Sequence, residues 1–180
     1  MTVNIFAIKD THTESAGRER ARSMILSGKI SVFFIEWAVP IDSKNINENF
    51  KGLAKGDAEP SLKVLAGLAL SKGIKVISCD LSADQTIHEL NSLNDGFGPY
   101  SIHSVFAHWG KAIRDKHAAE VIKTYITSNP HTQNGLVMFG SDHFIDHEDR
   151  GCPPLHKLIH SKVPAIDCYI INNHSGLYEQ

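Results

Sequence analysis

The chain has 180 residues, of which 42% are hydrophobic, and its formal net charge is −2 at pH 7. This length and composition indicate one globular domain over 1–180 rather than a disordered chain. Without a basic excess, general nucleic-acid binding is not expected, because that binding neutralises phosphates with lysine and arginine. No apolar run reaches the ~20 residues that span a bilayer, so no membrane span is expected.

The start of the chain has neither the basic residues nor the long apolar core of a secretory signal peptide. We therefore expect a soluble protein that is cytoplasmic or delivered into a host cell by a non-classical secretion system. The three cysteines, Cys79, Cys152 and Cys168, form no CxxC pair, so neither a zinc ribbon nor a dithiol redox motif is expected. Histidine is abundant, with 11 residues, and this directs attention to acid–base and metal sites.

Apolar runs alternate with helical periodicity along the chain. Strands are predicted over 3–8, 30–35, 74–78, 135–139 and 165–171. Helices are predicted over 14–27, 60–72, 83–93, 101–128 and 153–161, and the polar segment 42–57 is predicted to be a loop with at most one helical turn. This order predicts a single-domain α/β fold with a mainly parallel central sheet flanked by helices on both faces.

The helix predicted over 101–128 carries two stripes at helical spacing. The apolar stripe comprises Ile102, Phe106, Trp109 and Ile113, and the polar stripe beside it comprises His103, Gly110, Arg114 and His117. The apolar stripe is expected to face the core. The polar stripe would bring Arg114 toward the functional edge of the sheet, where a guanidinium can bind a carbonyl, a carboxylate or a developing oxyanion.

Polar residues follow the predicted strands at their carboxyl ends. They are Asp10 and His12 after the first strand, Glu36 after the second, Asp80 (a weaker candidate) after the third, and Asp142 and His143 after the fourth. In an open parallel sheet, ligands bind beyond these ends. Carboxylates and imidazoles gathered there suit direct activation of water, or a divalent metal that activates it. No cofactor is required by the sequence, and the metal stays an open alternative.

Several of these residues also have simpler interpretations. Asp10 alone could equally cap the first helix, and each histidine taken singly would be a polar residue near the surface. Arg18, Arg20 and Arg22 are interpreted as a solvated helix face, because residues two apart point to different sides. The convergence of three strand ends is what favours a functional site.

Two further features are interpreted as structural. The run 142–149 is rich in acids and histidine and permits a metal loop, but a solvated loop is favoured for 146–149. Cys152 has no base placed beside it by the sequence, so a nucleophilic role is not favoured. Cys79 ends an apolar strand and is expected to be buried.

Four short motifs in the predicted order point to a known group of proteins. They are Asp10-Thr11-His12, Phe34-Ile35-Glu36, Arg114-Asp115 and Gly140-Ser141-Asp142-His143. Together they resemble the erythromycin-esterase-like, ChaN-like and Tiki/TraB superfamily, over most of the chain. The superfamily commonly has Gly-Glu-x-His where this chain has Lys9-Asp10-Thr11-His12, so the carboxylate is retained but is one methylene shorter.

This resemblance implies an α/β fold with an active-site cleft at the strand ends. Members include an antibiotic-ring esterase, metal-dependent membrane proteases, a haem-binding lipoprotein and bacterial toxin domains, and a type III effector group is similar in fold. The resemblance implies hydrolysis of an ester or peptide bond in a small molecule or a protein, in a bacterial toxin or virulence effector.

The implied site comprises Glu36, His143, His12, Asp10 and Arg114. Glu36 would activate water, directly or through a metal, and His143 would be its acid or electrostatic partner. Asp10 and His12 would orient that pair or bind the metal, and Arg114 would hold the substrate. The alternative is a non-enzymatic effector or ligand-binding domain that uses the same cleft for haem or a host protein.

Overall fold

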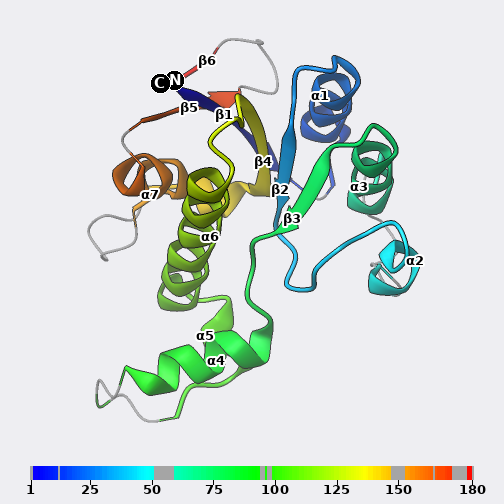
Figure 1. The fold of residues 1–180 in the computed structure, drawn as a ribbon. Helices are drawn as coiled ribbons and strands as arrows, with labels where there is room; N and C mark the ends of the chain where they lie inside the picture. The colour runs from blue at the N-terminus through cyan, green and yellow to red at the C-terminus, as the bar shows by residue number, and fades with distance from the viewer. Residues whose placement is uncertain are drawn as a thin grey trace.

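The computed structural model describes residues 2–11, 13–50, 59–93, 96, 99–146, 153–163, 165–171 and 178–179. The strands are β1 (Val3–Asp10), β2 (Val32–Ile35), β3 (Lys75–Ser78), β4 (Asn134–Gly140), β5 (Ile166–Ile171) and β6 (Tyr178–Glu179). They form one sheet in the order β3-β2-β4-β1-β5-β6 (Figure 1). Strands β1 to β5 are parallel, and β6 is antiparallel to β5. The predicted α/β class is confirmed.

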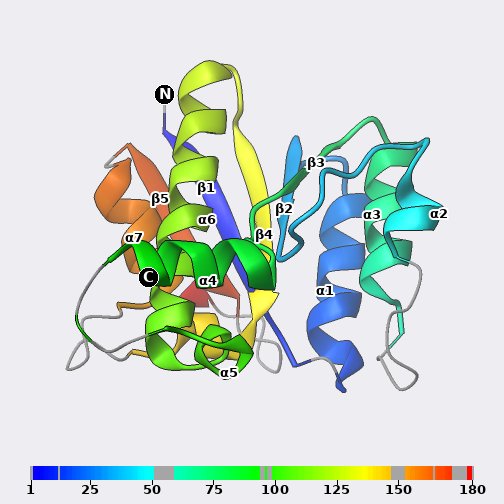
Figure 2. The same ribbon diagram turned by 90° about the horizontal axis from the view of Figure 1, so that it is seen from below.

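Helices cover both faces of this sheet. They are α1 (Ser15–Leu26), α2 (Ile46–Asn49), α3 (Leu62–Ser71), α4 (Ala83–Ser92), α5 (Ile102–Val105), α6 (His108–Ser128) and α7 (Leu155–Lys162), with a 3₁₀ helix over Ser141–Phe144. Figures 1 and 2 show α1 and α3 on one face and α6 and α7 on the other, while α4 and α5 lie beyond the sheet edge. None of the helices in the described residues combines the length and hydrophobicity that crossing a membrane requires.

The central strands bury both of their faces. Against α6 and α7 lie Ile5, Ala7, Phe34, Val137 and Phe139. Against α1 and α3 lie Ile8, Phe33, Ile35, Leu136 and Met138. Successive side chains of a strand point to opposite faces, so two covered faces require apolar residues at nearly every position. This explains why the strands appear in the sequence as continuous apolar runs.

The prediction of one continuous helix over 101–128 is wrong, because this stretch forms two helices, α5 and α6. Ala107 has an extended backbone, with φ −76° and ψ 165°, and separates α5 from α6. Helical spacing holds only within one continuous helix, so the predicted apolar stripe does not share a buried face. Ile102, Phe106 and Trp109 are instead 48%, 78% and 44% exposed.

Gly135 gives a direct test of packing at the centre of the sheet. A Cβ at this position would lie 2.6 Å from Ile5 Cδ1 and within 3.3 Å of both Phe34 and Val32. We expect Gly135→Ala to lower the free energy of unfolding by about 1–3 kcal/mol, as overpacking of a core does. Urea denaturation of the purified variant measures this change.

The matched control is Gly67→Ala in α3, where the added Cβ meets only Ile46 Cδ1 at 3.5 Å, an ordinary contact. Alanine is favoured over glycine within a helix by about 1 kcal/mol, so this variant should be as stable as the parent or more stable. Equal destabilisation by the two substitutions would contradict the packing described for β4.

Candidate functional site

Four strand ends meet at one edge of the sheet. Asp10 is paired in register with Gly140, the last residue of β4. Glu36 directly follows β2, and its backbone N–H donates to Met138 O at 3.1 Å. Asp80 follows β3 and its N–H donates to Trp37 O, so the segments beyond β2 and β3 remain side by side. The parallel topology therefore gathers polar residues that are distant in sequence.

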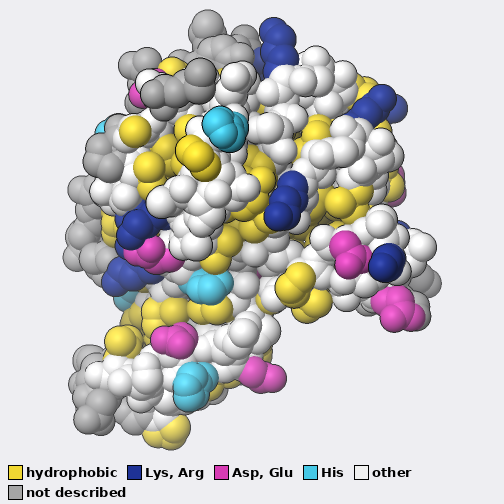
Figure 3. All heavy atoms as spheres, viewed as in Figure 1, with side chains coloured by type: hydrophobic (Ala, Val, Ile, Leu, Met, Phe, Trp, Pro, Cys, Tyr) yellow, Lys and Arg dark blue, Asp and Glu magenta, His cyan; other side chains and the backbone are white. Residues whose placement is uncertain are grey.

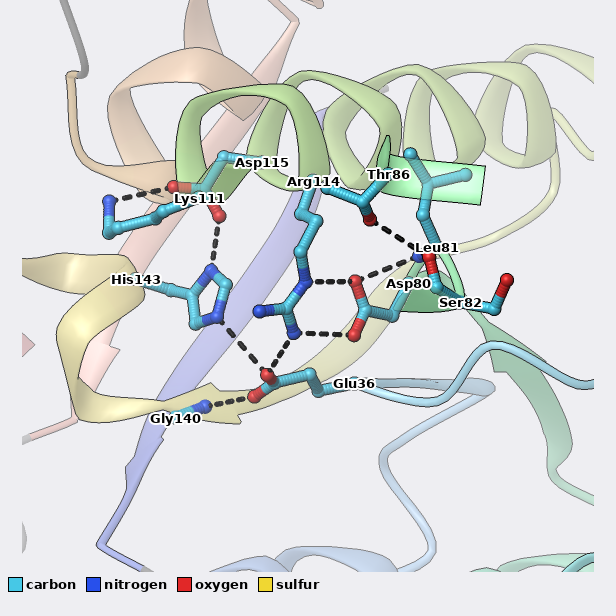
Figure 4. Close-up of polar contacts among 10 residues, drawn as sticks. All are labelled: Glu36, Asp80, Leu81, Ser82, Thr86, Lys111, Arg114, Asp115, Gly140 and His143. Carbon is cyan, nitrogen blue, oxygen red and sulfur yellow. Dashed lines mark hydrogen bonds and ion pairs between the residues drawn. The ribbon is translucent and has the colours of Figure 1, made fainter. Parts of the chain in front are cut away.

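Helix α6 contributes a second set of charged residues to this edge. Arg114 donates from Nε to Asp80 Oδ1 at 2.8 Å and from Nη2 to Asp80 Oδ2 at 2.5 Å. The same Nη2 lies 2.6 Å from Glu36 Oε1 (Figure 4). Its guanidinium therefore binds the carboxylates that follow two neighbouring strands.

Glu36 is held through both of its carboxylate oxygens. Its Oε1 contacts Arg114 and lies 3.1 Å from His143 Nε2. Its Oε2 accepts the backbone N–H of Gly140 at 2.6 Å. Three donors thus hold the Glu36 carboxylate in one orientation (Figure 4).

His143 lies between two carboxylates. Its Nδ1 contacts Asp115 Oδ1, and its Nε2 faces Glu36. The other oxygen of Asp115 accepts a hydrogen bond from Lys111 Nζ at 2.8 Å, one helical turn away on α6. Asp115 is fully buried and His143 is almost so. An imidazolium that donates from both ring nitrogens satisfies this geometry.

Burial and opposite charges in this network shift the pKa values of Glu36 and His143. Burial would raise the pKa of Glu36, but the hydrogen bond and charge of His143, with Arg114 and the Gly140 amide, lower it to about 2. Burial would lower the pKa of His143, but Asp115 and Glu36 raise it to about 9. At neutral pH, Glu36 is therefore an anion and His143 a cation.

A pocket of ≈ 340 Å³ opens beside the network. Its charged wall comprises Asp10, Glu36, Asp142, Lys111, Arg114 and His143. Val105 and Phe106, at the end of α5, line it as well. The site thus combines a charged wall with an apolar one.

Asp10 lines this pocket, but its carboxylate binds elsewhere. Arg18 on α1 donates from Nε and Nη2 to the two oxygens of Asp10, both at 2.9 Å. Arg18 is 1% exposed and Asp10 is 5% exposed. The interpretation of Arg18 as part of a solvated face is therefore wrong, because its charge is buried against Asp10. No contact places Asp10 directly on Glu36 or His143 among the described residues.

The structure brings Glu36, His143 and Arg114 together as predicted, and three further members join them. Asp80 was only a weak candidate, Asp115 belonged to the Arg114-Asp115 motif without an assigned role, and Lys111 had no predicted role. Their signal in the sequence is the spacing of Lys111, Arg114 and Asp115, which puts three charges on one turn of α6. His12, Cys152 and the segment 147–149 lie outside the described residues.

The remaining predicted positions lie away from the network or in the core. His117 lines a separate groove between α4 and α6, with Leu93 and Ile113. His103 belongs to α5, so it does not share the α6 face of Arg114. Cys79 is buried as predicted, and burial raises the pKa of its thiol.

The divalent metal left open by the sequence stays a prediction, because its proposed ligand His12 lies outside the described residues. No group of three or more histidine, cysteine, aspartate or glutamate side chains in the described part of the chain is placed to hold a metal ion. The contacts explain this: both oxygens of Glu36 already face donors, and the Arg114 guanidinium occupies the space between Glu36 and Asp80.

Comparison with known proteins supports the fold alone. No protein-family model matches the chain, and no curated protein matches it. Two solved structures described as bacterial protein toxins are similar, with TM-scores of 0.55 and 0.51 at 13% and 14% sequence identity. Each comparison covers 99% of this chain, which spans 36% of the length of each toxin chain. The chain therefore has a toxin-like fold, and the superfamily resemblance stays a prediction.

The pair of Asp10 and Arg18 is expected to be structural. Asp10→Asn leaves the buried Arg18 guanidinium without its carboxylate and should lower the free energy of unfolding by about 3 kcal/mol, as breaking a buried ion pair does. Urea denaturation measures this loss. Glu19→Gln is the control, because its pair with Arg22 is about half exposed and worth less than about 1 kcal/mol. Equal effects of the two variants would refute the buried pair.

The pH dependence of stability follows from the shifted pKa values. His143 is raised from 6.5 to about 9, so its contribution is complete below pH 6.5 and is lost as the pH rises through 9. Glu36 is lowered from 4.5 to about 2, so its contribution is complete above pH 4.5 and is lost as the pH falls through 2. The stabilisation is therefore greatest between pH 4.5 and 6.5.

We expect the difference in unfolding free energy between the wild type and His143→Gln to be largest in that window. From pH 6.5 to above 9 it should fall by an amount of the order of 3 kcal/mol. Denaturation in urea at pH 5.5, 7.5 and 9.5 measures it, with the exposed His131→Ala as control. A difference that grows with rising pH would show that His143 is not the protonated partner described here.

Proposed function

We propose that this chain is a hydrolase domain of the erythromycin-esterase, ChaN and Tiki type that cleaves an ester or peptide bond. The observation that supports the proposal is the position of His143, which bridges Glu36 and Asp115 on the wall of a pocket. A cationic imidazole held by one carboxylate and facing another is an arrangement for general acid–base chemistry.

The proposed reaction uses only groups present in the chain. A water molecule hydrogen-bonded to Glu36 attacks the substrate carbonyl and gives its proton to the Glu36 carboxylate. His143 gives its Nε2 proton to the leaving oxygen or nitrogen, so the bond breaks and two products form. The proton on Glu36 then passes to His143, which restores the starting state.

Arg114 and Asp115 prepare the two reacting groups. Asp115 orients the imidazole and stabilises its charge, while Lys111 neutralises the far oxygen of Asp115. Arg114 faces the pocket and can bind the oxyanion that develops on the carbonyl. His143, and after it Arg114, lower the pKa of Glu36 to about 2, so Glu36 is a weak base at rest and catalysis requires substrate to weaken its contacts with these two cations.

The toxin-like fold is consistent with an effector that acts on a host molecule. The substrate would be a small-molecule ester or a host protein. In this proposal Asp10 has a structural role: its ion pair with Arg18 joins β1 to α1, and its carboxylate does not contact the reacting bond. His12 keeps its proposed orienting role.

Turnover of p-nitrophenyl esters and of a fluorogenic peptide library tests the proposal. Glu36→Gln and His143→Gln should each lower kcat/KM by about 10²-fold or more, because each removes one partner of the proton transfer. Glu19→Gln and His131→Ala change the same residue types at exposed positions and should retain activity. Thermal unfolding of every variant checks that the assay uses folded protein.

A binding function without turnover is the second candidate. It is favoured by the fact that Glu36, Asp80 and Asp115 each already face a cation, so the network is satisfied without a substrate. Wild-type protein that cleaves neither ester nor peptide, yet requires Glu36 and His143 for an effect in host cells, would favour it. Full turnover by Glu36→Gln would reject the proposed hydrolysis.

A further inference from the structure

We propose that Phe106 binds an apolar group next to the substrate carbonyl, so that the pocket selects acyl compounds with an apolar side chain. The inference rests on the proposed function in one respect, because it assumes that the carbonyl of the substrate faces the charged wall of the pocket. It names a class of substrate and a specificity residue that the catalytic network does not include.

Phe106 is unusual because a large aromatic side chain is exposed to solvent at the edge of a pocket. Its residue is 78% exposed, the highest value among the exposed large hydrophobic residues of the described chain. It nevertheless lines the same pocket as Glu36, Arg114 and His143. A phenylalanine at the mouth of a charged pocket gains free energy only when a ligand covers it. Leu26 on α1 is also an exposed apolar residue, but it does not line this pocket.

The position of Phe106 depends on a close contact between two helices. A Cβ at Gly110 would lie 2.3 Å from Ser104 O and 2.5 Å from Val105 O. Only glycine at this position lets α6 approach the backbone at the end of α5. The approach brings Val105 and Phe106 to the pocket, within a lobe that shows hydrophobic side chains at its surface in Figure 3.

The two walls of the pocket identify the chemistry of the ligand. The charged wall contains three carboxylates and three cations, namely Asp10, Glu36, Asp142, Lys111, Arg114 and His143. A balanced wall offers hydrogen bonds to a carbonyl but no net attraction for a free ion. The apolar wall from α5 offers burial to the substituent on that carbonyl. An acyl group with an apolar side chain satisfies both.

Binding of two small amides tests this inference without any need for turnover. N-acetyl-leucinamide and N-acetylglycinamide share the amide groups and differ by one isobutyl side chain. In NMR titrations of the full chain, the leucine compound should bind at least about tenfold more tightly, the effect of burying a side chain of that size. Its addition should also shift the ring signals of Phe106.

Substitution of Phe106 then assigns the preference to one side chain. Phe106→Ala should abolish the difference between the two amides, and Phe106→Leu should retain most of it. Leu26→Ala removes an apolar residue that is 50% exposed at the far end of α1 and should change nothing. Because Phe106 is exposed, its variants should unfold at the wild-type temperature.

Equal affinity for the two amides, no binding of either, or a preference that survives in Phe106→Ala would each overturn the inference. The outcome is separate from that of the proposed function. If the preference depends on Phe106 but no ester or peptide is cleaved, the recognition site stands and the hydrolase proposal fails. If an ester or peptide is cleaved but the preference for the leucine compound is absent, the hydrolase proposal stands and the recognition site fails.

Discussion

The ion pairs of Arg114 with Glu36 and Asp80 join α6 to the ends of two neighbouring strands. A guanidinium removed from water is unfavourable unless carboxylates surround it, and here the ends of β2 and β3 supply them. Since the next residue on α6 is Asp115, the same attachment sets the distance between α6 and His143. The apolar contacts of α6 with the sheet determine where the helix lies, and Arg114 determines how its charged end meets the strands.

The balance of charge in the network has a chemical consequence. Both Glu36 and His143 are held in the state that would follow a proton transfer between them, with the carboxylate ionised and the imidazole protonated. Each member of this pair stabilises the charged state of the other, and a ligand that competes for the contacts of Glu36 would weaken that stabilisation. In the proposed hydrolysis, binding and reactivity are therefore linked, because a ligand that replaces an internal contact of Glu36 would restore basicity to that carboxylate.

Topology and the strand ends could be predicted from the sequence, because parallel strands buried on both faces appear as apolar runs and their carboxyl ends meet. That placed Glu36, His143 and Arg114 at one edge. The partners of the charged side chains could not be predicted. Asp10, for example, binds Arg18 eight residues away, and this contact depends on how α1 packs on β1. The break at Ala107 was missed because its neighbours have helical composition, and it is the extended backbone of Ala107 in the structure that reveals it.

The connection between β3 and β4 contains α4, α5 and α6, and it supplies both the apolar wall and four of the charged residues, Asp80, Lys111, Arg114 and Asp115. The main contacts of α4 and α5 are with each other and with α6. Their sequence can therefore change with little effect on the sheet, provided that α6 keeps its charges. On the proposed function, related chains could diversify the molecules they recognise by exchanging α4 and α5, while the strand ends and α6 retain the charged network.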